Sequence, residues 1–298
     1  MNKIHFFLLI CIAIAIAVSV MVVKNQAEVE ESITFFPIDP SVTYKKVDTN
    51  LSLLDHSKRE DYDVKWRVSS ALDRDAYLRQ DLAFLYANGR LKRMMGEWEQ
   101  NTEQVVQEEI INMKESSHFE AISFHHAEIH YDGDVDGSEK IYSAQSLSAD
   151  ELYVIDSSFS PLHSFREAHS KEEKEWKSVL DQITSQQLEY SWSKMMTENS
   201  INEDQYHQIP LTDIAQYKNK SYPGFTKEET NTIMGNLWEG LYKNYFLGIK
   251  KKDGSIVEPI DSTIPLILIA KNQTELLVIS ELKDGEAIVL RQNLSPTR

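Results

Sequence analysis

The segment 124–137, FHHAEIHYDGDVDG, holds the residues of this chain that are best suited to chemistry. If it forms a β-strand, alternate side chains share a face, so one face carries His126, Glu128, His130 and Asp132. Imidazoles combined with carboxylates are a ligand set suited to zinc or iron. The segment therefore predicts a divalent-metal site at these four residues. The alternative, which we favour because no second ligand cluster is evident, is an amphipathic strand with a solvated polar face.

An acidic turn follows directly and resembles part of a calcium-binding loop. Asp132, Asp134 and Asp136 occupy positions 1, 3 and 5 of an EF-hand pattern, which needs a bidentate Glu at position 12. That position is Ser143, so the pattern fails in its second half. A weak calcium turn is one interpretation, and a plain acidic hairpin turn is the favoured one.

Other signatures of catalysis are absent from the sequence. There is no Gly-x-Ser-x-Gly, no phosphate-binding loop and no dinucleotide fingerprint. The single cysteine, Cys11, lies in an apolar run, where it predicts neither a nucleophile nor a disulfide. We therefore predict no catalytic residue, and no cofactor beyond the possible divalent metal.

The elements that must position the histidine segment are predicted from periodicity and turn residues. Alternation at Val64, Trp66 and Val68 indicates a half-buried strand. Asn88-Gly89 between two apolar segments predicts a hairpin with a two-residue turn, against the alternative of one helix over residues 73–98. The apolar spacing in 102–116 predicts a short helix.

The second half of the chain shows two capped helices and a meander. Ser170 with Glu173, and Thr226 with Glu229, are capping boxes at the start of two helices, the second of which runs over 227–246 with an aromatic stripe expected to be core. Strands are predicted at 119–131, 140–144, 152–155, 249–252, 255–260, 264–270, 275–281 and 286–292.

An apolar run at residues 6–23, FFLLICIAIAIAVSVMVV, bears on location. It is long enough to cross a hydrocarbon core and contains no charge, so it predicts an uncleaved transmembrane anchor. The alternative is a signal peptide cut after Ala27, although Asn25 is a poor residue for that site. The predicted organisation is a cytoplasmic end (1–5), the anchor (6–23), a stalk (24–60) and two subdomains (61–165 and 166–298).

Composition limits the partners. The formal net charge is −16, and all 47 acidic residues follow Lys24, which disfavours nucleic acid. An exterior part without cysteine fits the surface of a Gram-positive bacterium. The predicted fold class is α+β: an N-terminal single transmembrane helix followed by antiparallel sheets with packed helices.

The predicted membrane anchor and the absence of catalytic signatures together suggest a function. We expect a single-pass protein of the cell membrane, with most of the chain extracytoplasmic, that binds a protein or cell-envelope ligand as an accessory or regulatory factor without catalysis. The alternative is a metal-dependent cell-surface hydrolase built on His126, Glu128 and His130.

Overall fold

The predicted α+β class is wrong, because the chain is mostly β. The computed structural model describes residues 36–54, 61–132, 139–157, 160–251 and 254–294. Of these, 53% lie in strands and 24% in helices, and the largest element is a nearly closed, barrel-like sheet. The predicted anchor at 6–23 lies outside the described residues. Among the described ones, no helix has both the length and the apolar character needed to cross a membrane.

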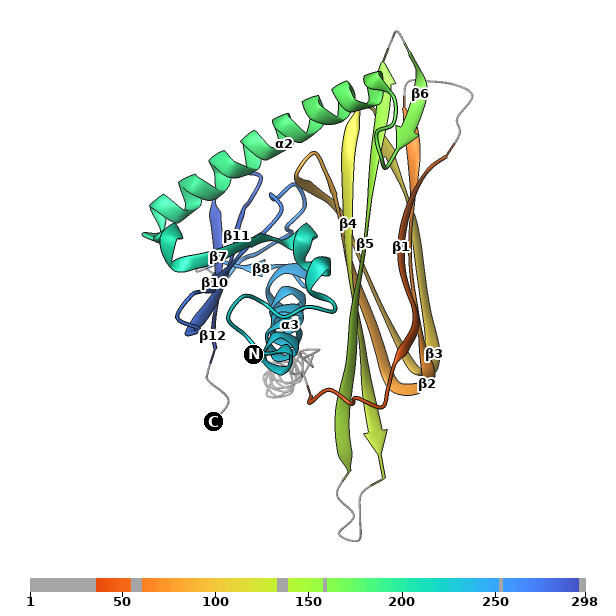
Figure 1. The fold of residues 1–298 in the computed structure, drawn as a ribbon, viewed down its shortest axis with the longest axis vertical. Helices are drawn as coiled ribbons and strands as arrows, with labels where there is room; N and C mark the ends of the chain where they lie inside the picture. Colours follow the sequence, from red (N-terminus) through yellow and green to blue (C-terminus); the bar gives the residue numbers. More distant parts are fainter. Residues whose placement is uncertain (1–35, 55–60, 133–138, 158–159, 252–253, 295–298) are drawn as a thin grey trace, which may run out of the picture. The chain divides into compact units, whose positions relative to one another are not determined.

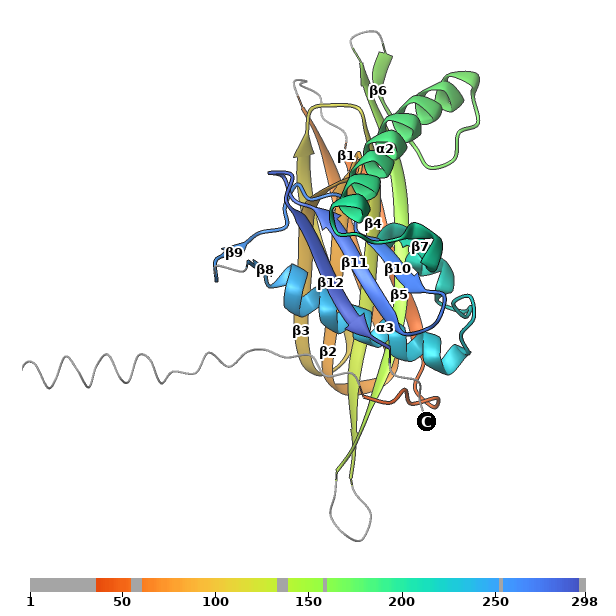
Figure 2. The same ribbon diagram turned by 90° about the vertical axis from the view of Figure 1, so that its left-hand side faces the viewer.

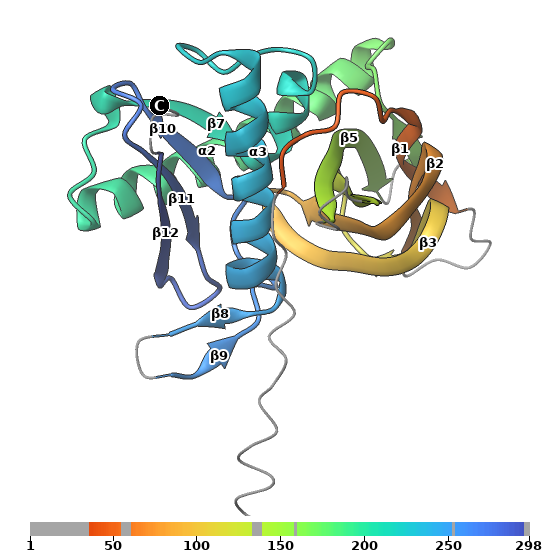
Figure 3. The ribbon, with the colours of Figure 1, turned by 90° about the horizontal axis from the view of Figure 1, so that it is seen from below.

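The large sheet has six antiparallel strands (Figure 1). The strands are β1 (Tyr44–Leu54), β2 (Tyr62–Ala87), β3 (Arg90–Met113), β4 (Ser117–Tyr131), β5 (Lys140–Ser157) and β6 (Ser160–Phe165). The long strand β2 pairs with β1 and β3 in its first half, and with β3 and β4 in its second half. Its register against β3 shifts between Ala71 and Ala76. This shared strand lets the sheet curl, as Figure 3 shows.

The predicted helix at 102–116 is also wrong, because these residues belong to β3 and the bend that follows it. Val105 and Ile111 are buried, whereas Val106 and Ile110 are exposed, so the observed period is two. The apolar pairs Val105-Val106 and Ile110-Ile111 fit a helical stripe as well as an alternating strand. Pairing with β2 decides between them.

The Asn88-Gly89 hairpin is confirmed. Both residues have positive φ, 50° and 74°, and Ala87 pairs with Arg90 across the turn. The N–H of Asn88 donates to the carbonyl of His118 (2.9 Å), and its side-chain oxygen accepts from the N–H of His118 (2.9 Å). The turn therefore also ties β2 to the beginning of β4.

A second sheet has the strand order β12-β11-β10-β7. Its strands are β7 (Tyr206–Pro210), β10 (Leu266–Ala270), β11 (Glu275–Glu281) and β12 (Ala287–Asn293), while β8 (Ile249–Lys250) and β9 (Ile256–Val257) form a separate hairpin. The last three predicted strands of the meander are therefore confirmed. Helix α2 (Lys171–Glu198) packs Met195 and Met196 on one face of this sheet, against Leu266 and its neighbours.

Helix α3 (Lys227–Leu241) lies between the two sheets, as Figures 1 and 3 show. Both predicted capping boxes are present, at Ser170 for α2 and at Thr226 for α3. The π-helix η3 (Tyr242–Phe246) continues α3, and Tyr245 packs edge-on against Phe84 of β2, 5.7 Å between ring centroids. The aromatic stripe is core, as predicted.

Residues 34–298 form one compact unit. The predicted stalk, 24–60, includes β1, whose Leu51 is fully buried in the core of the large sheet. The predicted boundary between subdomains, at 165/166, falls between β6 and α2. In Figure 2, α2, α3 and the second sheet lie in front of the large sheet.

Candidate functional site

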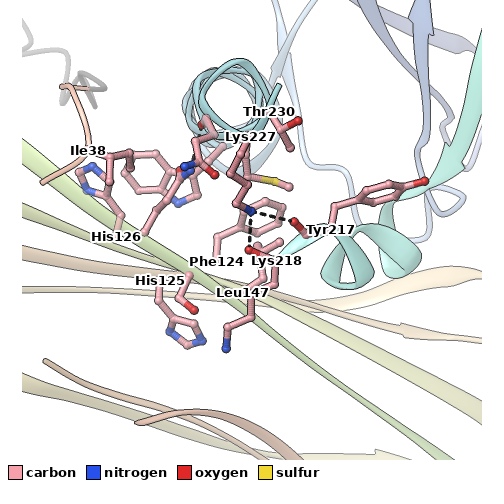
Figure 4. A pocket seen from close by; sticks show the side chains of 14 residues that line it. Ile38, Phe124, His125, His126, Leu147, Tyr217, Lys218, Lys227 and Thr230 are labelled. Atoms are coloured by element: carbon pink, nitrogen blue, oxygen red, sulfur yellow. Dashed lines mark hydrogen bonds between the residues drawn. The ribbon is translucent and has the colours of Figure 1, made fainter. Parts of the chain in front are cut away.

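A cavity of about 160 Å³ lies where α3 crosses β4 and β5 (Figure 4). Its floor comes from the two strands, its roof from α3, and one wall from the 3-10 helix η2 (Leu211–Tyr217). The side chains that give it an apolar character are Ile38, Phe124, Leu147, Met234 and Trp238. The cavity is thus an apolar slot between a sheet and a helix, the kind of place where ligands commonly bind.

His126 forms part of the floor, and its surroundings fix its charge. Its ring stacks on Trp238 with 4.2 Å between centroids, and only 4% of the residue is exposed. Burial lowers the pKa of His126 to about 3, so the imidazole is neutral. Oγ of Ser143 accepts a hydrogen bond from the N–H of Phe36 (3.0 Å) and is hydrogen-bonded to Nε2 of His126 (3.1 Å).

The roof and wall are fixed by hydrogen bonds to backbone carbonyls. Gln145 of β5 donates to the carbonyl of Asn231 in α3 (2.9 Å), which joins floor to roof. Lys227 donates to the carbonyl of Lys218 (2.8 Å), as the dashed lines in Figure 4 show, and so holds the end of η2 against α3. These contacts keep the slot open without filling it.

The rim carries positive charge. Lys218 is exposed beside the cavity, and partial burial lowers the pKa of its ammonium. In the part of the chain that the structure describes, this ammonium has neither a hydrogen-bond nor an ion-pair partner. In a chain with a net charge of −16, a free cation at the rim of an apolar slot is the feature suited to an anionic group.

The predicted metal ligands are divided between two places. Glu128 pairs with His130, whose other ring nitrogen donates to Glu139 (2.6 Å) and whose ring stacks on Tyr77. Burial lowers the pKa of His130, but the two carboxylates outweigh burial and raise it. Both ring nitrogens of His130 are hydrogen-bonded to carboxylates, so in this arrangement neither is free to bind a metal.

His126, by contrast, is turned into the cavity. Asp132 is exposed at the end of β4, while Asp134 and Asp136 lie outside the described residues. Among the residues described, no group of three His, Cys, Asp or Glu side chains is placed to hold a metal ion. Occupancy by a divalent metal or by calcium remains a prediction.

Sequence reasoning singled out His126 but missed the rest of the cavity. Trp238 and Lys218 come from elements about 90 to 110 residues further along the chain, and no local pattern connects them to β4. The arrangement can hold one ring or one short apolar chain, with an anionic group at the rim. Compared with protein-family models, curated proteins and solved structures, the chain shows no significant match to any of them.

Proposed function

We propose that this protein is an accessory binding protein whose cavity takes an apolar group, with an attached anionic group, from a protein or envelope ligand. The observation that carries the proposal is the slot itself: apolar walls from two elements, held open by hydrogen bonds, with Lys218 at its rim. No nucleic acid fits this proposal, because the chain is strongly acidic.

The size of the slot limits the ligand. Apolar cavities of about 150 Å³ accommodate a benzene ring. The cavity here, about 160 Å³, therefore suits one phenyl-sized group, such as an aromatic or aliphatic side chain of a peptide. Walls formed by Phe124 and Trp238 favour an aromatic ring, which stacks well against both.

Location is the second part of the proposal. We place the binding at the outer face of the cell membrane, supported by the apolar run at residues 6–23 alone. Protease added to intact protoplasts should then degrade the folded part of the chain. Full protection from protease would contradict this location.

The test of the binding proposal uses 3-phenylpropionate, which joins one ring to one carboxylate. One buried ring supports an affinity on the order of millimolar. Saturation-transfer NMR should show transfer to the ring protons, and the transfer should disappear in Leu147→Trp, which fills the slot from β5. Leu147→Met changes the volume little and serves as the matched control.

Two results would contradict the proposal. One is the absence of saturation transfer with folded wild-type protein at ligand concentrations of tens of millimolar. The other is equal transfer in Leu147→Trp and Leu147→Met, which would place the ligand elsewhere. Circular dichroism of both variants checks that each is folded.

A further inference from the structure

The inner face of the curled sheet, on the opposite side of β4 and β5 from the cavity, holds a line of buried polar side chains. Asp81 and Arg79 of β2 are 0% exposed, and His125 of β4 is 1% exposed. Ser148 of β5 completes the line and is partly exposed. His125 and His126 both border the cavity, but in Figure 4 the ring of His125 points away from it, toward the other side of the sheet.

The distances along this line are those of a hydrogen-bonded relay. Oδ2 of Asp81 lies 2.7 Å from Nδ1 of His125, and Nε2 of His125 lies 2.7 Å from Oγ of Ser148. A carboxylate on one imidazole nitrogen and a hydroxyl on the other is the arrangement that activates a serine nucleophile. In the tautomer whose hydrogen lies at Nδ1, facing Asp81, the imidazole presents the lone pair of Nε2 to the hydroxyl of Ser148. Because Thr49 donates its own hydroxyl hydrogen to Ser123 (2.7 Å), the single hydrogen of Ser148 has two acceptors within 2.7 Å, Nε2 of His125 and Oγ1 of Thr49.

Arg79 lies beside the relay but is not part of it. Its Nη2 is 3.9 Å from Oδ1 of Asp81, so the two opposite charges share the dry interior. The guanidinium donates to the carbonyl of Glu103 (2.6 Å) and to the hydroxyl of Ser70. Arg79 thus compensates the buried carboxylate while leaving Oδ2 to His125.

Several atoms in this interior have no partner. Within the described ranges, Oδ1 of Asp81, Nε of Arg79 and the hydroxyl of Tyr44 are buried without a hydrogen bond. Unsatisfied polar groups are costly in a core, and packed apolar side chains would fill the same space more favourably. Proteins retain such costs mainly at functional sites.

Ser148 lies at a seam where, among the described residues, two edges of the sheet meet without a ladder. β5 pairs with β4 on one side and with β6 on the other only from Tyr153 onward, and β1 pairs with β2, so the edges of β1 and β5 meet near Ser148 without β-pairing. Side chains bridge them instead: the hydroxyl of Thr49 is 2.7 Å from that of Ser148, and Asp150 accepts from the N–H of Leu51 (2.7 Å). Side-chain bridges can part to admit a small molecule more easily than a ladder can.

The same edge supplies a hydrogen-bond donor. The N–H of Ser143 points away from β4, because it donates to the carbonyl of Pro37 (2.8 Å). Strand alternation directs the N–H of Ala149 to the same side. Ala149 is exposed and follows Ser148 directly, so its N–H is placed at the seam beside the nucleophile, where charge would develop on a substrate oxygen.

We propose that Ser148 is a nucleophile for acyl transfer from small carboxylic esters, with His125 as general base and Asp81 as the positioning residue. Oγ of Ser148 bonds to the ester carbon while its proton moves to Nε2 of His125, and the alcohol leaves with that proton as its C–O bond breaks. Water then gives its hydroxyl to the acyl carbon and a proton to His125. The acid departs, and Oγ of Ser148 takes the proton back.

The test is covalent labelling of the folded wild-type protein with an alkyl fluorophosphonate. Oγ of Ser148 would form the bond to phosphorus and fluoride would leave, which gives one adduct on the peptide that contains Ser148 by mass spectrometry. Ser148→Ala should lose the adduct. Ser178→Ala, at an exposed serine of α2, should keep it.

Asp81→Asn tests the positioning role separately from folding. It should slow labelling by several orders of magnitude, because the asparagine amide cannot hold the same imidazole tautomer. A purely structural Asp81 would change the unfolding midpoint but not the labelling rate of the molecules that remain folded.

The result on the wild-type protein decides the proposal even if a variant fails to fold. No adduct, an adduct on another serine, or an adduct that forms only in urea would each overturn it. Labelling does not depend on the α3 cavity, so failure here leaves the binding proposal standing, and the reverse also holds.

Discussion

His125 and His126 are neighbours in β4, yet they lie in opposite surroundings. His126 faces α3, where Trp238 covers its ring and burial lowers its pKa to about 3. His125 faces the inside of the curled sheet, where Asp81 and Ser148 hydrogen-bond its two nitrogens. Both residues are almost completely buried. Burial alone therefore does not determine the chemistry that is open to a histidine. The polar atoms that contact its ring nitrogens determine it as well.

The two faces also differ in how they contribute to stability. On the α3 side, ring stacking and apolar contact dominate, so substitutions there should act through lost packing. On the inner side, a charged pair and a chain of hydroxyls replace apolar packing, so substitutions should act through unpaired charge. Variants of single residues can separate these two effects.

The largest effect is expected for Asp81→Ala. This change leaves the guanidinium of Arg79 buried without its carboxylate, and breaking a buried pair typically costs about 3–5 kcal/mol. Urea unfolding followed by circular dichroism should show a loss of that size in the free energy of unfolding.

Its control is the double variant Arg79→Met/Asp81→Leu, which removes both charges. The double variant should lose clearly less stability than Asp81→Ala, because no charge is left unpaired. Equal losses would mean that the inner face acts through packing, like the outer one.

The next effect is a pH dependence from His126. Its pKa is about 3 in the fold and about 6.5 in an unfolded chain, so between these values only the unfolded state binds the proton. Stability is complete above pH 6.5 and falls by about 1.4 kcal/mol per unit below it, a loss of about 2 kcal/mol at pH 5. Urea midpoints at pH 7 and pH 5 measure this loss.

His126→Leu provides the control for this dependence. The variant lacks the titrating group, so its loss of stability between pH 7 and pH 5 should be smaller by about 2 kcal/mol. The same loss in variant and wild type would show that His126 is not responsible.

The sequence predicts on which face of β4 each of these side chains lies, but not which other elements pack against that face. Alternation along β4 put His126, Glu128 and His130 on one face and His125 on the packed face, and the exposure of the strand agrees for His125. The face of His126 was expected to be solvated. It is buried because α3, about a hundred residues further on, covers it, and periodicity carries no information about such distant contacts.

Local signals succeeded where local chemistry decides the structure. The capping boxes at Ser170 and Thr226 and the turn at Asn88-Gly89 depend on a few adjacent residues, and all three are present. The segment 102–116 failed because its apolar pairs fit two periods and a partner strand chose between them. Likewise, Asp81, His125 and Ser148 belong to three different strands, so no single sequence segment predicts that they are hydrogen-bonded to one another.

A smaller effect is expected at the turn that ties β2 to β4. In the pairing of β2 with β4, Asp81 lies opposite His125 and Gln80 lies opposite His126. The turn therefore helps to fix the register that positions both histidines. Gly89→Val forces a β-branched residue to φ 74°, with its Cβ 3.1 Å from Thr184, and should cost about 1–2 kcal/mol. Gly254→Val, also at positive φ but in open space, is the control that separates backbone strain from crowding. A Gly89→Val protein as stable as wild type would remove the support for this role of the turn.

The smallest effect belongs to Lys218, at the rim on the His126 side. Lys218→Met should leave the free energy of unfolding within about 0.5 kcal/mol of wild type, because the side chain is exposed and, among the described residues, unpaired. Its contribution should appear only in binding. An exposed ion pair is worth about 0.2–1 kcal/mol, so 3-phenylpropionate should bind up to about fivefold more tightly than the neutral 3-phenylpropan-1-ol. In Lys218→Met this preference should vanish while the alcohol binds as before. If the preference survives, another cation holds the carboxylate, and Lys227→Met tests the other lysine that lines the cavity.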